Sequence, residues 1–74
     1  MTKKHSPLNI IAIICTKLEQ GVPEEDIRKS LDLENELLFY IEFALENNWI
    51  VKREDGRYKL TAYGKKFVSE FRSL

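Results

Sequence analysis

The stretch VKREDGRYKLTAYGKKF, residues 51–67, restricts the fold more than any other segment of this chain. Asp55-Gly56 is a preferred dipeptide for a two-residue type I′ turn, and alternating apolar and polar residues flank it on both sides. The pattern predicts a β-hairpin that runs directly into a helix, with Thr61 as the N-cap of that helix. A folded chain must therefore place a hairpin against helices.

A two-residue turn would fix the hairpin register and, with it, the side chains that share a face. It pairs Val51 with Leu60 and Arg53 with Tyr58. One predicted face packs on the protein through Val51, Tyr58 and Leu60, with Arg53 lying on the tyrosine ring. The other face is exposed and mostly basic, and it carries Lys52, Glu54, Arg57 and Lys59.

Three helical segments are predicted before the hairpin. The first begins with Pro7 at its first helical position and closes with Gly21. The second begins at Pro23, and the third covers about residues 34–48 after a turn short enough for a helix-turn-helix unit. Helix, helix, helix, hairpin and helix is the order of a winged helix-turn-helix domain, which is an α+β fold.

Chain length limits the number of domains, and the distribution of charge bears on the possible binding partners. The 74 residues permit one domain, residues 1–74, in which residues 1–6 are expected to form a flexible basic arm. The net charge is zero but uneven: residues 1–18 carry +3, residues 19–49 carry −7 and residues 50–74 carry +4. Because the middle of the chain is acidic and both ends are basic, a charged partner would be attracted to some regions of the protein and repelled by others.

The third helix divides into two faces on a helical wheel. Its outer face holds aromatic and acidic residues and no lysine or arginine, so only Asn35 and Asn47 offer hydrogen bonds to a base edge without repelling phosphates. Its core face is predicted to contain Leu37, Leu38, Ile41, Ala44 and Leu45.

The aromatic residues of the outer face suggest a contact surface with an apolar centre and a polar rim. Phe39, Tyr40 and Phe43 are predicted to contact a partner protein or a second copy, together with Phe67 and Phe71 of the final helix. The alternative is that the final helix folds back and covers the first three with the last two.

The segments YIEFALENNWI and DGRYKLTAYGKKFVSEF resemble the small archaeal winged-helix regulators, a group that includes dimeric chromatin-associated DNA-binding proteins. The resemblance implies a third helix that enters the DNA major groove, a hairpin that touches the neighbouring backbone or minor groove, and a homodimer. The final helix here is too short for the long dimerising coiled coil common in that family. The shared positions are Tyr40, Trp49, Ile50, Tyr58, Leu60, Thr61, Gly64 and Phe67.

Two functions from different classes follow. The first is a DNA-binding transcriptional regulator or chromatin-associated protein that contacts double-stranded DNA mainly through its basic wing, as a homodimer. The second is a winged-helix protein-interaction module that uses the acidic and aromatic face of the third helix. The residues predicted to contact DNA are Lys52, Arg53, Arg57, Lys59, Asn35, Lys65 and Lys66.

An enzyme is not expected. His5 is the only histidine, and the chain has neither a glycine-rich phosphate loop nor a plausible metal-ligand set, so no cofactor or small-molecule substrate is inferred. Cys15 is the only cysteine and lies in an apolar run, which predicts a buried, inert thiol. That run is too short to cross a membrane, and the expected location is the cytoplasm, on the nucleoid if the protein binds DNA.

Overall fold

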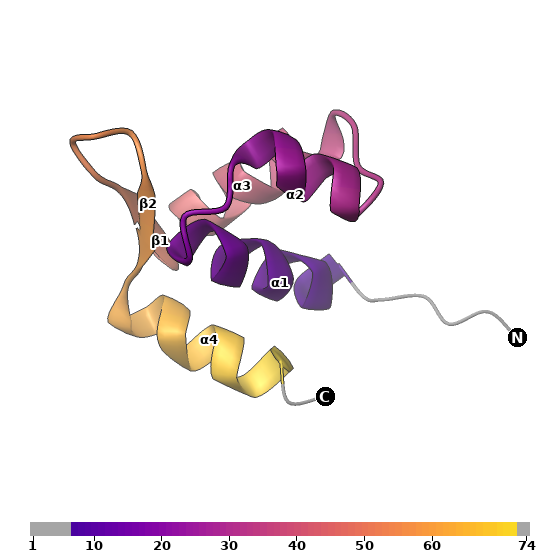
Figure 1. Ribbon diagram of the computed structural model, residues 1–74. Coiled ribbons are helices and arrows are strands. Elements are labelled where there is room, and N and C mark those ends of the chain that lie inside the picture. Colours follow the sequence, from indigo (N-terminus) through magenta and orange to yellow (C-terminus); the bar gives the residue numbers. More distant parts are fainter. Residues whose placement is uncertain (1–6, 73–74) are drawn as a thin grey trace, which may run out of the picture.

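The computed structural model describes residues 7–72, and its elements follow one another in the predicted order (Figure 1). They form a small α+β domain whose arrangement is consistent with that of a winged helix. The arm predicted for residues 1–6 lies outside the described residues. The elements are α1 Pro7–Glu19, α2 Glu24–Ser30, α3 Glu36–Glu46, β1 Ile50–Lys52, β2 Tyr58–Leu60 and α4 Ala62–Arg72.

The first three helices end in the same backbone motif. In each, the second residue after the helix has a positive φ, and the next N–H donates to a carbonyl five residues earlier. The N–H of Val22, for example, donates to the carbonyl of Lys17 at 3.0 Å. Glycine occupies the positive-φ position only after α1; aspartate and asparagine occupy it after α2 and α3. The three residues are Gly21 (φ 85°), Asp32 (56°) and Asn48 (62°).

Helix α1 runs through the middle of the domain, with α3 on one side and α4 on the other (Figure 1). It touches each of the other helices and β2, which explains why it supplies more core residues than any other described element. Cys15 is fully buried within it, as predicted. The core consists of Ile11, Ala12, Ile14, Cys15, Leu18, Ile27, Leu37, Ile41, Ala44, Ile50, Phe67 and Val68.

The predicted register of the hairpin is wrong by one residue. The strands pair Ile50 with Leu60 and Lys52 with Tyr58, because the loop has three residues rather than two. The Gly56 N–H donates to the Arg53 carbonyl at 3.0 Å, and Gly56 has a φ of 88°. This is a type I turn that ends in a left-handed residue, the usual geometry of a three-residue hairpin loop.

The register changes which side chains face the core. Ile50 is buried at 1% exposure, whereas Val51, predicted to pack, is 41% exposed beside Lys59. Lys52 rather than Arg53 lies over the Tyr58 ring, with its Nζ 5.9 Å from the ring centroid. Burying the larger side chain at position 50 favours this register over the predicted one.

Helix α3 is shorter than predicted, and the prediction that Leu38 lies on its core face is wrong. Leu37, Ile41 and Ala44 are buried, but Leu38 is 62% exposed. The buried residues follow one another at intervals of four and three, which is a narrow stripe. A helix that rests on α1 and β1 from one side buries only that stripe, so Leu38 at its edge stays in solvent.

Candidate functional site

The joint between the hairpin and α4 determines where the hairpin projects. The Thr61 hydroxyl accepts a hydrogen bond from the Gly64 N–H at 3.0 Å, as expected of an N-cap, and donates to the Asn48 carbonyl. The Thr61 N–H donates to the Trp49 carbonyl at 3.0 Å. One residue thus caps α4 and ties it to the chain entering β1.

Aromatic stacking completes this joint. The Phe67 ring lies parallel to the Trp49 indole, with ring centroids 3.8 Å apart, and Phe71 packs on Phe67 at 4.9 Å. Phe67 is only 6% exposed, so it belongs to the core of the single chain and has little surface for the partner contact predicted of it. Phe71 is half-buried beside it. Thr61, Gly64 and Phe67 therefore have structural roles.

The C-terminal end of α1 is tied to β2 by a side chain that was not among the predicted site residues. The Glu19 carboxylate, at the end of α1, accepts the N–H of Leu60. That N–H points away from β1, because Leu60 and Ile50 form a pair that exchanges no hydrogen bonds. The bond gives the outward-pointing N–H of β2 a hydrogen-bond acceptor, and it does not cover the outer face of the hairpin.

The basic side chains of the hairpin do not all share one face. Arg53 and Lys59 lie with Val51 on the outer face, while Lys52 lies on the inner side over Tyr58. Arg53 also pairs with Asp55 at 3.5 Å, and both side chains are about half exposed. An exposed pair of this kind is weak and leaves the guanidinium available to another anion.

Arg57 occupies a different position from the one predicted. It lines a pocket of about 330 Å³ with Tyr58 and the turn between α1 and α2. Its Nη1 lies 4.0 Å from the point where a Cβ on Gly21 would stand. Arg57 is exposed, but its charge sits at the side of the hairpin nearest that turn rather than on the outer face.

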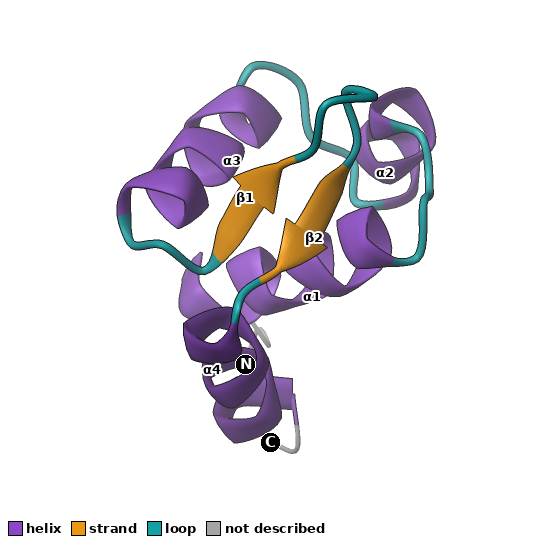
Figure 2. Cartoon of the chain, turned by 90° about the vertical axis from the view of Figure 1, so that its left-hand side faces the viewer, coloured by secondary structure: helices purple, strands orange, loops and turns teal. Residues whose placement is uncertain are grey.

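The other residues predicted to contact DNA are exposed but come from separate elements. Lys65 and Lys66 lie in the first half of α4, the helix that stands below the hairpin in Figure 1. Asn35 precedes α3, and its side chain makes no capping hydrogen bond. Because β1 packs beside α3, the hairpin and α3 lie next to each other (Figure 2).

The exposed face of α3 is apolar and acidic. Phe39 is 70% exposed, Leu38 62% and Phe43 43%, and the helix contains no lysine or arginine between Glu36 and Glu46. The pKa of the Glu36 carboxyl is lowered, chiefly by the hydrogen bond it accepts from the Glu34 N–H at 2.9 Å. This face therefore presents carboxylates around exposed aromatic rings.

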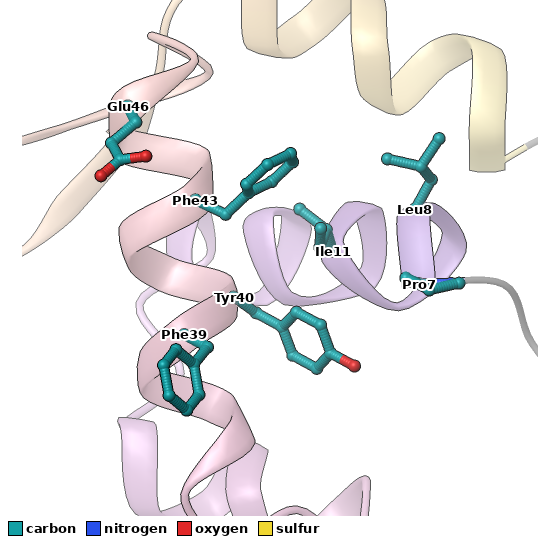
Figure 3. Close-up of a pocket in the computed structure, with 7 residues that line it drawn as sticks. All are labelled: Pro7, Leu8, Ile11, Phe39, Tyr40, Phe43 and Glu46. Carbon is teal, nitrogen blue, oxygen red and sulfur yellow. The ribbon is translucent and has the colours of Figure 1, made fainter.

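A groove of about 400 Å³ lies between α1 and α3, and we call it the α1–α3 groove. Phe43 and Tyr40 project from α3 toward α1, where Ile11 forms part of the floor, and Phe39 stands at the outer edge (Figure 3). Tyr40 is half-buried, so the predicted aromatic cluster is a wall of this groove. The residues lining it are Pro7, Leu8, Ile11, Phe39, Tyr40, Phe43 and Glu46.

A second groove, of about 360 Å³, lies between α1 and α4, and we call it the α1–α4 groove. Tyr63, which is 71% exposed, stands on it and was not among the predicted site residues. Tyr63 lies four residues before Phe67, so a helical wheel places it on the same side of α4 as Phe67 and Phe71, and the wheel alone would not have shown that it is exposed. The residues lining this groove are Leu8, Trp49, Tyr63, Lys66, Phe67, Glu70 and Phe71.

Cys15 and Asp55 are two titratable groups whose pKa values are shifted by the local structure. Burial raises the pKa of the Cys15 thiol to about 12, which keeps it protonated and unreactive. The pKa of Asp55 is lowered, first by the hydrogen bond from the Arg57 N–H at 3.0 Å. Within residues 7–72, no cluster of histidine, cysteine and acidic side chains could hold a metal ion.

Comparison with models of known protein families, with curated proteins and with solved structures finds no match to this chain. Among the helices of the described region, none has the length and apolar character needed to span a membrane. The candidate site therefore rests on the hairpin and the two grooves alone.

Proposed function

We propose that this chain is a winged helix-turn-helix DNA-binding protein of the archaeal regulator type, acting in transcription or chromatin organisation. The observation that carries the proposal is the hairpin, which projects from the domain with Lys52, Arg53 and Lys59 exposed (Figure 1). Phosphate contacts need positive charge and hydrogen-bond donors, and the hairpin supplies both. The resemblance of the hairpin and α4 sequence to those regulators supports the same function.

The hairpin, rather than α3, is the contacting element in this proposal. A helix in the major groove reads bases with side-chain donors, and α3 has carboxylates and aromatic rings instead. Asn35 and Asn47, at the two ends of α3, are the polar side chains near it that suit a base edge, and the Asn47 amide also donates to the Phe43 carbonyl at 2.9 Å. Lys65 and Lys66 extend the basic surface along α4.

The test is fluorescence anisotropy of a labelled mixed-sequence duplex, titrated with the protein at several salt concentrations. About four phosphate contacts per chain should give a slope of log affinity against log salt of roughly −4. Lys59→Glu should weaken binding at least about fivefold and reduce the magnitude of the slope by about 1, because Lys59 lies on the outer face.

Lys29→Glu is the matched control. Lys29 is an exposed lysine on the acidic helix α2, where it pairs weakly with Glu25 at 3.9 Å. The substitution makes the same change in net charge away from the hairpin, so it should leave affinity within about twofold. Equal losses in both variants would mean that net charge alone drives binding, and the hairpin would then not be the site.

A second candidate function is a protein-interaction module, favoured by the exposure of Leu38, Phe39 and Phe43 on one helix. Apolar side chains rimmed by charged ones are typical of protein contact surfaces. Absence of duplex binding at low salt and high protein concentration would reject the DNA function and leave this one. The exposed face of α3 would then be the surface to pursue.

A further inference from the structure

The pocket of about 330 Å³ beside Arg57 lies between the hairpin loop and the turn that joins α1 to α2, and we call it the hairpin pocket. Its floor is apolar, because it is made by the buried Leu18 and the half-buried Val22, and the half-buried Tyr58 ring forms one wall. In Figure 2, α2 stands on the same side of the hairpin as β2. A pocket of this volume is at the lower end of the range for small-molecule sites, so a ligand that fits it must be small.

Two charged side chains line the hairpin pocket, one from each side. Arg57 comes from the hairpin, and its Nη1 lies 4.0 Å from the point where a Cβ on Gly21 would stand. Glu24 is the first residue of α2. Burial and, after it, the charge of Glu24 raise the pKa of the Tyr58 hydroxyl, which indicates that the carboxylate is close to that wall. The pocket therefore has a cation on the hairpin side and an anion on the α2 side.

Both charges are available to a ligand. Within the described part of the chain, neither Arg57 nor Glu24 forms an ion pair. The neighbouring acids have partners of their own: Asp55 pairs with Arg53 at 3.5 Å, and Glu25 pairs with bases of α2. None of these neighbours lines the pocket, so Arg57 and Glu24 are the charged groups that a bound molecule would meet.

This arrangement of charge restricts the chemistry of the ligand. A guanidinium binds a carboxylate through two parallel hydrogen bonds, and a carboxylate accepts hydrogen bonds from an ammonium group. Glu24 would repel a phosphate or another multiply charged anion, and Arg57 would repel a cation that lacks a carboxylate. A molecule with one carboxylate, one ammonium group and an apolar side chain satisfies both charges and the floor.

We propose that the hairpin pocket binds a small zwitterion of the amino-acid class, a free α-amino acid or a short peptide, whose carboxylate contacts Arg57 and whose ammonium group contacts Glu24. The apolar side chain of the ligand lies on Leu18 and Val22. A bound ligand connects the hairpin loop to the α1–α2 turn, and it gives Arg57 a role apart from DNA contact. This inference does not rest on DNA binding, and its test contains no DNA.

An NMR titration of the full chain with L-leucine, and separately with leucyl-leucine, is the first measurement, because it detects weak binding and locates it. The amide signals of Gly21, Val22 and Arg57 should shift and saturate with at least one of the two. Two analogues test the need for both charges: leucinamide lacks the carboxylate, and 4-methylpentanoate lacks the ammonium group. Each analogue should bind at least about tenfold more weakly than leucine, since it leaves one charge of the pocket unpaired.

Two variants identify the partner of each ligand charge. Arg57→Gln should weaken leucine binding at least about fivefold and should not weaken leucinamide binding, because leucinamide has no carboxylate to lose a contact. Glu24→Gln should weaken leucine binding to a similar extent and should not weaken 4-methylpentanoate binding. Arg53→Gln and Glu25→Gln are the matched controls: they remove the same charges from residues outside the pocket, so leucine affinity should stay within about twofold.

Three results would overturn the proposal: no saturable shift at this pocket with leucine or leucyl-leucine, analogues that bind as tightly as leucine, or control variants that lose as much affinity as Arg57→Gln. Arg57 and Glu24 are both exposed, and circular dichroism with thermal melting checks that each variant is folded. The DNA-binding test is read from Lys59→Glu, on the outer face of the hairpin, so the two proposals can fail separately.

Discussion

Gly64 allows α4 to lie close to the backbone that leads into β1. A Cβ at this position would stand 1.8 Å from the Trp49 carbonyl oxygen and 2.7 Å from its carbon. Both are backbone atoms, which cannot move aside as the end of a flexible side chain can. The absence of a side chain lets the first turn of α4 pack directly on the backbone leading into β1.

Gly64→Ala should therefore destabilise the fold by at least about 3 kcal/mol, through a steric clash that only movement of α4 can relieve. Gly56→Ala is the matched control, because a Cβ there would meet nothing within 4 Å and only the positive φ opposes it. The control should cost about 1 kcal/mol. Urea unfolding measures both, and equal losses would show that close approach is not what requires Gly64.

Helix α3 has two adjacent leucines with different environments. Leu37 is buried at 4% exposure and Leu38 is 62% exposed. Hydrophobic patterning alone assigns both to the core, whereas contacts with α1 and β1 select the first. The exposed Leu38 side chain therefore adds apolar surface to the outer side of α3 that the core of the single chain does not bury.

Leu37→Ala should lower the free energy of unfolding by about 2–5 kcal/mol, since it removes buried methyl groups and leaves a cavity. Leu38→Ala should change it by no more than about 0.5 kcal/mol. Denaturant unfolding of both variants gives the comparison. A large loss for Leu38→Ala would place that side chain in a contact absent from the single chain.

The domain as a whole separates its charges. The acidic residues concentrate on α2 and α3 and the basic ones on the hairpin and α4, so the sign of the charge changes from one part of the domain to another. In the proposed function, DNA contact uses the outer face of the hairpin. A chain of 74 residues has a small core, and association would add to its stability.

If the chain is a homodimer, as its resemblance to the archaeal regulators implies, its melting temperature should rise with protein concentration, by about 3 °C for a tenfold increase. Differential scanning calorimetry at several concentrations measures this shift. Phe39→Asp should melt at a temperature independent of concentration, because a monomer unfolds without dissociating. Lys59→Glu should keep the wild-type dependence, which would separate the hairpin from the association surface.

Local sequence determined the elements and their order. Proline at the start of α1, glycine after it, Thr61 at the cap of α4 and the turn residues around Gly56 act over a few neighbouring residues, so their effects can be recognised without a structure. The positions of the basic, acidic and aromatic candidate residues along the chain followed from the same patterns. The existence of the hairpin was predictable for this reason.

Tertiary contacts decided the register of the hairpin, the burial of Phe67, the exposure of Leu38 and the two grooves. Each of these features depends on the distances in space between elements that are far apart in the sequence. No local sequence pattern specifies those distances. A shift of one residue between the strands moves every side chain of one strand to the opposite face of the hairpin. Burial of Ile50 selects the observed register over the predicted one. The two grooves lie along α1, where Leu8 meets side chains of α3 in one and of α4 in the other, and these contacts join residues far apart in the sequence.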